Sequence, residues 1–541
     1  MRRRLIATIA ALALVGGAAG CTAASTAAPT STSSAVASGA TGTTTTTTTA
    51  AATALTSESV VAANSDPTTV NEDEWSAADA QDITLQGDTA SSSSGSVTID
   101  GATVTITAAG VYRLSGTLNG GVVVAAPEDA LVVLILDGAT ITNAAGPAIT
   151  VATAEDVAIH LADGSTNSVS DASSYAEDAD ANAAIYSEAD LTISGTGSLS
   201  VTGNGNDGIT SKDDLVILGG TIDVVAADDA LVGKDALVVE GGTLTLDAGG
   251  HGLKSDKDDD ETKGWIWIRG GVIDITAAED GLNATTDVVI DDGQLTIAAG
   301  DDGIHADKTA LIAGGQATVT SSVEGLEGQD VVVTGGVVDI TSSDDGINGS
   351  GDAATDATGE TAEGGFGGGM DTDTGETVVL AGGTVTVNAD GDGIDSNGSL
   401  TISGGTVTVY GPTNDGNGVF DANGAFTVTG GTILGIGSSG MAQMPGDAST
   451  QGWVATTTAI SAGQQVSVTD ADGAEVASTT APKSAQLVFF SSADVADGAT
   501  YTVSVDGAQA ATATEGESTV GGMGMGGPGG GQGGMGGGRR P

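Results

Sequence analysis

A three-residue phrase recurs along the middle of this chain at an almost constant spacing. The phrase is a carboxylate, then Gly, then Ile or Leu, as in Asp207-Gly208-Ile209 and Asp302-Gly303-Ile304. From one copy to the next, the central residue advances by 22, 22, 29, 22, 22, 21 and 47 positions. The two long steps contain visible insertions, residues 257–263 and the Gly-rich run 349–375. A period of this length indicates a solenoid, in which every repeat forms one coil of a stack.

Each repeat has the pattern of three short strands joined by tight turns. In residues 214–235, Leu215 and Ile217 form one alternating apolar pair, Ile222 and Val224 form a second, and a third short strand follows. The chain has 87 Gly and 3% aromatic residues, which favours many short strands over a large globular core. The signatures of leucine-rich repeats and of nine-residue calcium-binding β-rolls are absent. We therefore predict an all-β fold, a parallel β-helix with three short strands per coil of about 22 residues.

The first residues have the features of a secretion signal. Three Arg precede an apolar run that is too short to span a bilayer, and small residues then lead to Cys21, the only cysteine. This order predicts a lipoprotein signal peptide at 1–21 with lipidation of Cys21, although a plain secretory signal with a chance cysteine would have the same features. The predicted location is extracellular, with a lipid anchor at the cell surface.

Composition divides the rest of the chain into four segments. The Ser/Thr/Ala-rich residues 22–75 have too little large apolar surface to fold and are predicted to be a disordered tether. The β-helix is predicted at 76–452. Residues 453–510 lose the period but keep strand alternation, which predicts a small β module that covers the carboxyl end of the stack. The Gly/Met-rich tail, 511–541, is predicted to be disordered.

The acids of the recurring phrase would form a ladder along one edge of the stack. Carboxylates on successive coils repel each other, so they either splay into water or share cations. Rows of oxygen ligands suit Ca²⁺, which we predict as a cofactor at this edge. The alternative is that each Asp accepts hydrogen bonds from turn amides. The predicted calcium ligands are Asp207, Asp228, Asp229, Glu279, Asp280, Asp301, Asp302, Glu324, Asp344, Asp345 and Asp392, and His251 replaces the acid in one coil.

Apolar residues also occupy outward positions of the first strand in each coil, among them Val216, Val238 and Val289. A strand that is apolar on both faces is normally covered, here by another segment, a partner or a ligand. Trp265 and Trp267 stand on the same outward face, directly after the charged insertion. Two exposed indoles would form a stacking platform that binds the sugar rings of a carbohydrate. Packing of both indoles beneath the inserted loop is the alternative.

The ordered succession of motifs is more specific than any single copy of the phrase. Its most informative parts are residues 183–187 (AAIYS), 191–199 (LTISGTGSL), 206–209 (NDGI), 212–215 (KDDL), 324–328 (EGLEG) and 344–348 (DDGIN). Across about residues 96–450 the chain thereby resembles a family of bacterial secreted β-helix proteins described as carbohydrate-binding domain proteins, related to cellulose- and pectin-binding surface proteins. The resemblance implies a right-handed parallel β-helix similar to pectate-lyase-like folds, with bound Ca²⁺ and glycan binding without a demonstrated reaction. The chain departs from the recurring phrase at Ala230 and His251.

Charge limits the partner. A formal net charge of -57 excludes nucleic acid, and it allows an anionic glycan to dock only through Ca²⁺ bridges or the few lysines. A neutral glycan meets no such barrier. The predicted function is therefore non-catalytic binding of an extracellular polysaccharide, cellulose-like or pectin-like, by a calcium-stabilised monomer that contacts the membrane only through its lipid anchor.

Two other functions stay open. A calcium-dependent lyase would need a basic residue to remove a proton next to a carboxylate. Lys212 and Lys234 occupy equivalent positions in successive coils, but beside acids they also fit a salt-bridged ladder. A hydrolase would use paired carboxylates, which the ladder supplies everywhere. The other possibility is a structural adhesin or spacer that binds Ca²⁺ but no glycan.

Overall fold

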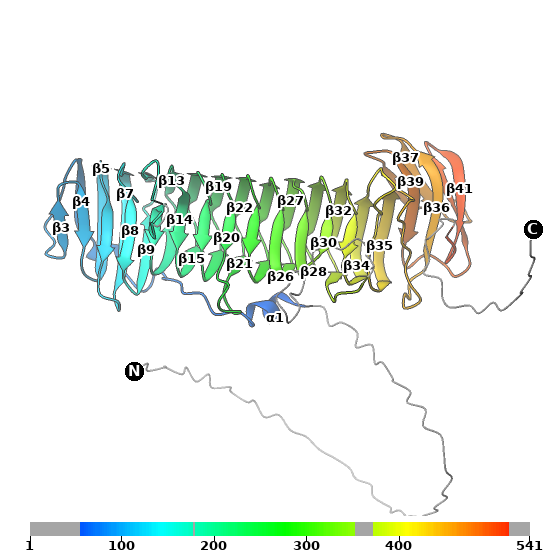
Figure 1. Cartoon of the computed structure of the whole chain (residues 1–541), viewed down its shortest axis with the longest axis horizontal. Helices are drawn as coiled ribbons and strands as arrows, with labels where there is room; N and C mark the ends of the chain where they lie inside the picture. Colours follow the sequence, from blue (N-terminus) through cyan, green and yellow to red (C-terminus); the bar gives the residue numbers. More distant parts are fainter. Residues whose placement is uncertain (1–54, 177–178, 352–371, 519–541) are drawn as a thin grey trace, which may run out of the picture. The chain divides into compact units, whose positions relative to one another are not determined.

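The computed structural model describes residues 55–176, 179–351 and 372–518. These residues form an all-β structure in which one large, mostly parallel sheet winds into a stack of coils (Figure 1). The prediction of an all-β, β-helix-like fold is confirmed. The predicted signal peptide with Cys21, most of the tether, most of the Gly-rich insertion and the end of the tail lie outside the described residues. Within the described ranges, no helix is long and apolar enough to cross a bilayer.

Strands three apart in the chain pair in parallel, so three strands complete one coil. β14 pairs with β17 and β17 with β20, while β15 pairs with β18 and β16 with β19. The stack therefore has three faces, named the first, second and third face after the order of the strands in a coil such as 214–235. Some strands bend from one face into the next: β5, β7, β34 and β35 run from the first face into the second, and β26 and β28 from the third face into the first.

The first face contains β1 (Gln81–Gly87), β5 (Gly110–Leu118), β7 (Leu131–Thr142), β9 (Asp156–Leu161), β12 (Asp190–Gly195), β15 (Asp214–Ile217), β18 (Ala236–Val239), β21 (Trp265–Ile268), β24 (Asp287–Ile290), β26 (Ile304–Ile312), β28 (Leu326–Val333), β31 (Thr377–Leu380), β34 (Ser399–Tyr410) and β35 (Phe426–Gly437). The second face adds β10 (Thr166–Ser170), β13 (Ser198–Gly203), β16 (Thr221–Ala226), β19 (Thr243–Ala248), β22 (Val272–Ala277), β25 (Gln294–Ala298), β27 (Gln316–Ser321), β29 (Val337–Ser342) and β32 (Thr384–Ala389). The third face adds β4 (Thr103–Ile106), β6 (Val122–Ala125), β8 (Ile149–Thr153), β11 (Ala183–Ser187), β14 (Asp207–Ser211), β17 (Leu231–Gly233), β20 (Leu253–Ser255), β23 (Leu282–Ala284), β30 (Ile347–Gly349) and β33 (Ile394–Ser396). Two short helices precede them, α1 (Ser57–Val61) and the 3₁₀ helix η1 (Ala77–Asp79).

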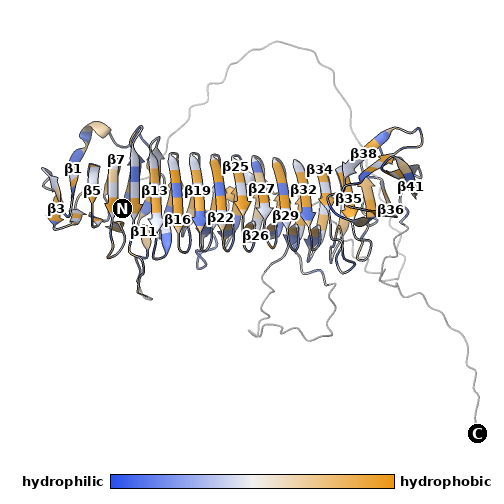
Figure 2. Cartoon of the chain, turned by 90° about the horizontal axis from the view of Figure 1, so that it is seen from above, coloured by the Kyte–Doolittle hydropathy of each residue, from blue (hydrophilic) through white to orange (hydrophobic). Residues whose placement is uncertain are grey.

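The core is the aliphatic interior of the coils. Leu215, Leu237 and Ile266 are consecutive partners in the first face, and none of them has exposed surface. Because neighbouring strands lie about 4.8 Å apart, equivalent inward residues stack directly on one another. Figure 2 shows hydrophobic and hydrophilic residues alternating along the stacked strands, as expected where one side of a strand is buried and the other faces solvent.

The glycine of the recurring phrase is required by the close approach of the next coil. A Cβ atom on Gly281 would lie 2.4 Å from Cγ2 of Ile297 and 2.5 Å from the carbonyl oxygen of Gly303. A β-branched residue stands at the place of Ile297 in each of these coils, in the pairs Gly208/Val224, Gly252/Ile275, Gly303/Val319, Gly325/Ile340, Gly346/Val387 and Gly393/Val409. In the coil of Ala230, the equivalent inward residue is Leu246, in register with Val224. Since Leu branches at Cγ instead of Cβ, it leaves room for the methyl group of Ala230.

Antiparallel strands close both ends of the stack. At the amino end, β2 (Ala90–Ser92) pairs with β1 and β3 (Val97–Asp100) pairs with β4. At the carboxyl end, β39 (Ala485–Ser491) pairs with both β35 and β36 (Trp453–Ile460). A second sheet of β38 (Glu475–Thr480), β37 (Gln465–Thr469), β40 (Thr500–Val505) and β41 (Ala508–Thr514) packs a small core against β35, β36 and β39. These additions occupy strand edges that would otherwise accept another chain.

Residues 55–80, named the N-terminal strap, lie along the outside of the first face and cover its apolar residues. In α1, the buried Val60 packs against Val289 and Leu311, and Val70 packs further along against Val133. Figure 1 shows this blue helix beside the green strands of the middle of the chain. The outward apolar stripe predicted from the sequence is thus covered by another segment of the same chain.

Hydrogen bonds also hold the strap. Asn64 donates to Asp287 at 2.8 Å, and the backbone N–H of Thr68 donates to Asp214 at 2.7 Å. The strap buries the Asp214 carboxyl, and this burial raises the pKa of Asp214 to about 7; the Thr68 N–H opposes the rise, and repulsion from Asp190 adds to it. Docking of the strap therefore disfavours the ionised form of Asp214.

We expect Gly281→Ala to destabilise the stack by about 1–3 kcal/mol, because the new methyl group overlaps Ile297 and the next coil. The double variant Gly281→Ala/Ile297→Leu should recover part of this loss, since a Leu accommodates Ala230 in the natural sequence. Urea and thermal unfolding of both variants, with Ile297→Leu as control, measure the difference. If the single and double variants are equally unstable, branching at the Cβ of residue 297 does not determine whether Ala is tolerated at position 281.

The strap should also give the protein a pH dependence that Asp214→Asn removes. A folded-state pKa of about 7, against about 3.9 in the unfolded chain, means that the folded state binds more protons between these pH values. The free energy of unfolding therefore falls as the pH rises from about 4 to about 7. Asn keeps an acceptor for Thr68 without the charge, so the variant should match the wild-type melting temperature near pH 4 and exceed it by a few degrees at pH 8. Asp223→Asn, at an exposed site of the next strand, is the matched control. If the difference in melting temperature between Asp214→Asn and the wild type does not change with pH, Asp214 is not the source of the pH dependence.

Candidate functional site

The acidic ladder lies at the corner between the second and third faces, and it is hydrogen bonded from coil to coil. One carboxylate oxygen accepts the backbone N–H of the ladder residue in the next coil, as in Asp302 to Asp280 at 2.8 Å and Asp392 to Asp345 at 2.6 Å. The acids that accept in this way are Asp207, Asp229, Asp280, Asp302 and Asp345. His251 takes the same place, since its Nδ1 lies 3.2 Å from the backbone nitrogen of Asp280. The turn-amide alternative therefore describes one oxygen of these acids, and the second oxygen of Asp207, Asp229 and Asp280 has a side-chain partner.

Those partners belong to a row of outward side chains on the third face that our sequence reasoning missed. Each stands three residues after a ladder position: Thr210 donates to Asp207 at 2.9 Å, and Asn283 donates to Asp280 at 2.6 Å. Several third-face strands have only three residues, so no alternation marks them in the sequence. The fixed offset of three residues from each acid is the signal that could have found them. This third-face row is Tyr186, Thr210, Val232, Lys254, Asn283, His305, Glu327, Asn348 and Asp395.

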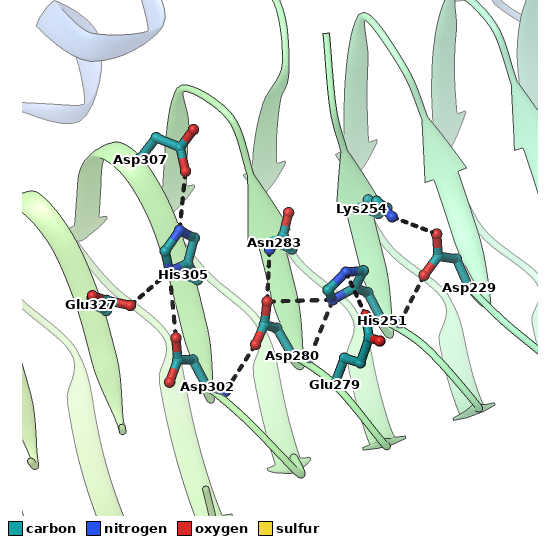
Figure 3. Close-up of polar contacts among 10 residues, drawn as sticks. All are labelled: Asp229, His251, Lys254, Glu279, Asp280, Asn283, Asp302, His305, Asp307 and Glu327. Atoms are coloured by element: carbon teal, nitrogen blue, oxygen red, sulfur yellow. Dashed lines mark hydrogen bonds and ion pairs between the residues drawn. The ribbon is translucent and has the colours of Figure 1, made fainter. Parts of the chain in front are cut away.

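In the middle of the ladder, nitrogen-bearing side chains neutralise or bind the acids, as Figure 3 shows. Nζ of Lys254 lies 2.9 Å from Oδ2 of the buried Asp229. Nε2 of His251 lies 3.0 Å from Oε2 of Glu279. These side chains supply, from within the chain, part of what a bound cation would supply.

His305 contacts three carboxylates, more than the other nitrogen-bearing side chains of the ladder. Its Nδ1 lies 2.8 Å from Glu327 and 3.4 Å from Asp302, and its Nε2 lies 3.0 Å from Asp307 (Figure 3). Burial lowers the pKa of His305, but hydrogen bonds with the three carboxylates outweigh it and raise the pKa to about 12. The imidazole is therefore a cation at neutral pH, and it balances these acids itself.

Toward the amino end of the ladder, three predicted ligands come together. Asp207, Asp228 and Asp229 each place a carboxylate oxygen within 4.8 Å of the others. Burial, and then repulsion from Asp229, raises the pKa of Asp207 to about 7. The cluster thus concentrates negative charge in partly buried surroundings, which disfavours the fully ionised form.

The same three acids line a pocket with a volume of about 180 Å³, and lysines stand on its other side. Nζ of Lys234 lies 3.4 Å from Asp256, which fits the predicted salt bridge. Nζ of Lys212 instead lies 6.0 Å from the ring centroid of Tyr186. The pocket therefore combines carboxylate acceptors with ammonium donors on a rigid sheet.

Toward the carboxyl end, the structure adds two acids that the sequence analysis did not select. Asp392 is joined by Asp395 of the third-face row and by Asp421, with carboxylate oxygens within 4.8 Å of one another. Burial, with repulsion from Asp345 and Asp421, raises the pKa of Asp392 and of Asp395 to about 7. In the ranges that the structure describes, no basic side chain forms an ion pair with Asp392 or Asp395.

Of the remaining predicted ligands, Asp302 groups with His305 and Glu327, and the others form no such cluster among the described residues. Asp301 and Asp344 precede ladder acids but are exposed. Glu324 accepts a hydrogen bond from Asn348 at 2.7 Å, and its burial raises its pKa to about 8. The predicted set of eleven residues is therefore divided. Among the described residues, three acids gather at each of its two ends, and at the amino end Lys254 pairs with one of them, Asp229.

The prediction that Trp265 and Trp267 form an exposed platform is wrong. Trp265 has no exposed surface, and Trp267 packs in the cluster beneath the strap that contains Val60. Their rings stack on each other with centroids 5.7 Å apart, and Nε1 of Trp267 donates to Asp291 at 2.8 Å. The alternative is packing beneath the inserted loop; the structure instead packs Trp267 beneath the N-terminal strap.

Comparisons with known proteins bear on the same region. Residues 100–359 match the model of a family described as carbohydrate-binding domain-containing protein. A solved structure described as the polysaccharide lyase-like protein from C. thermocellum, gadolinium derivative, is 33% identical, covers 43% of this chain and 96% of that chain, and has a TM-score of 0.42. None of the curated proteins compared matches the chain. The family match includes the pocket and the ladder from Asp207 to Asp345, and it supports a carbohydrate-binding family for this protein.

Proposed function

We propose that this chain is a non-catalytic polysaccharide-binding protein of the cell surface, exported by the signal peptide at 1–21 and anchored through a lipid on Cys21. Its ligands are polysaccharides of the plant-cell-wall type, and the calcium-stabilised β-helix acts as a monomer. The observation that carries the proposal is that the family match covers the pocket at Asp207 and most of the ladder beside it.

The chemistry of the pocket suits a sugar unit. A sugar presents many hydroxyl groups, which donate to carboxylates and accept from ammonium groups. The pocket offers both kinds of partner, Asp228 and Asp229 on one side and Lys212 and Lys234 on the other. These side chains stand in the short turns that connect paired strands, which limits their movement before a ligand arrives. The third-face row continues this polar surface along the stack.

The ends of the ladder suit Ca²⁺. Two oxygen atoms that bind one calcium ion at about 2.4 Å can be up to about 4.8 Å apart, and three carboxylates meet this limit at each end. Asp392, Asp395 and Asp421 would hold an ion at the carboxyl end, and Asp207 with Asp228 and Asp229 would hold one at the amino end. When bound, the ion supplies positive charge that stabilises the ionised carboxylates.

The calcium proposal predicts opposite effects of one double variant in two buffers. Asp392→Asn/Asp395→Asn removes two mutually repelling buried charges, so in a chelator the variant should be at least as stable as the wild type. In calcium the wild type should gain about 3 kcal/mol at an ion concentration 100 times its dissociation constant, and the variant should gain clearly less. Thermal unfolding with EDTA and with CaCl₂ measures both, and Asp344→Asn is the exposed control. If the melting temperature of the wild type is the same with EDTA and with CaCl₂, the protein has no structural calcium ion.

The binding proposal predicts that the full chain is retarded in gels that contain a soluble polysaccharide and is retained on insoluble cellulose. Asn182 also lines the pocket, and Lys212→Ala/Asn182→Ala removes two of its polar groups. This double variant should weaken retention about tenfold, if each hydrogen bond contributes about 0.5–1.5 kcal/mol. Thr245→Ala, on the exposed side of the second face, should leave retention unchanged. If neither neutral glycans nor pectin with Ca²⁺ retain the protein, the proposal is contradicted. The function as a structural adhesin or spacer would then be the one that fits.

A second candidate function rests on the two lysines of the pocket. In a calcium-dependent lyase, an acid cluster binds the ion that neutralises a uronate, and a lysine removes the adjacent proton. Lys212 has the freer ammonium group of the two, since Lys234 is paired with Asp256. A lyase would release unsaturated products that absorb ultraviolet light, and this absorbance would disappear in Lys212→Ala.

A further inference from the structure

A second pocket lies between the end of the N-terminal strap and the first face. Its volume is about 340 Å³, nearly twice that of the pocket beside the ladder. The strap contributes Glu74, Trp75 and Asp79, and the first face contributes Gln81, Leu131 and Val133. The strap therefore builds one wall of this pocket and the β-helix builds its floor.

The side chains that form the apolar part of the pocket are packed against their neighbours. Val133 is buried in the cluster beneath the strap, and Leu131 is half-buried beside it on the same strand. The indole of Trp75 is half-buried and packs its edge on His160, with ring centroids 4.9 Å apart and an angle of 67° between the rings. A ring held in this way loses little conformational entropy when a ligand binds.

The polar part consists of hydrogen-bonding groups without a basic residue. The Glu74 carboxylate accepts from the backbone N–H and the amide of Asn71, at 2.8 and 3.1 Å through the same oxygen. This arrangement leaves the other Glu74 oxygen for a ligand. In the described part of the chain, neither the Asp79 carboxylate nor the Trp75 Nε1 has a hydrogen-bond partner, and both stand beside the apolar floor.

These features together match the chemistry of a neutral pyranose ring. Such a ring presents C–H groups on its face, which pack on an indole and on aliphatic side chains, and hydroxyl groups at its edge, which donate to carboxylates and accept from an indole N–H. An anionic uronate would meet Glu74 and Asp79 without a counter-charge. A quaternary ammonium group is bound by cages of several aromatic rings, whereas this pocket has one.

We propose that the pocket at Trp75 binds one sugar unit of a neutral polysaccharide. This inference rests on the proposed glycan binding of the chain and names a binding site and a ligand class for it. It also gives the strap a function beyond covering apolar surface, because the site exists only where the strap is docked.

The test uses the full chain labelled with 5-fluorotryptophan, whose four tryptophans give separate ¹⁹F resonances. Trp75→Phe identifies the resonance of Trp75, and Trp267, which packs under α1, reports whether the strap stays docked. Titration with cellohexaose and mannohexaose should shift the Trp75 resonance and leave that of Trp267 in place. Hexagalacturonate and choline should shift neither.

A matched pair of variants separates binding from folding. Asp79→Ala removes an exposed carboxylate of the pocket and should weaken neutral oligosaccharide binding about tenfold, whereas Asp82→Ala removes an exposed carboxylate just outside it and should not. The inference is overturned if the wild type is retained by polysaccharides while the Trp75 resonance does not move, if choline moves it instead, or if the two variants bind equally. Loss of all polysaccharide retention by the wild type would overturn the proposed function itself.

Discussion

The rest of this structure depends on one constraint: equivalent residues of successive coils lie directly above one another, at the spacing of neighbouring parallel strands. For aliphatic residues the constraint is favourable, because Leu215, Leu237 and Ile266 fill the space above one another and exclude water. For carboxylates it is unfavourable, because each coil places a negative charge near the last one. The backbone N–H groups and the donors of the third-face row offset that repulsion, whereas burial of the ladder strengthens it by lowering the local dielectric.

The response differs along the ladder, and this difference locates the site. In the middle, Lys254 and His305 place positive charge among the acids, so the charge is balanced within the chain. At the ends the acids outnumber the cations, and burial together with repulsion raises the pKa of Asp207 and Asp392 to about 7. Excess buried negative charge favours ligands that bring positive charge or many hydroxyl donors, which are the two kinds proposed here.

The parts of the fold that repeat could be predicted from the sequence, and the parts that do not repeat could not. The alternation at Leu215 and Ile217 and the recurring phrase at Gly208 give the coil, its core and the ladder. The partners of the ladder acids were missed because third-face strands are too short to show a pattern. The Trp265 prediction failed because an outward position does not mean an exposed one when a segment about 200 residues earlier in the chain packs over it. Nothing periodic marks that segment, so only the folded chain reveals the contact.

The N-terminal strap covers the apolar stripe that the repeated coils leave on the first face. It also forms a pocket that the repeated coils alone do not form. Identical coils give an outward apolar stripe as regularly as they give an apolar core, and such a stripe would favour aggregation if uncovered. The strap covers it with Val60 and Val70 while adding side chains that the coils lack. Trp75 is one of them, and together with Leu131 and Val133 of the first face it lines a pocket that the strap completes. In a chain with so few aromatic residues, the proposed sugar-binding pocket therefore lies where a unique segment covers a repeated one.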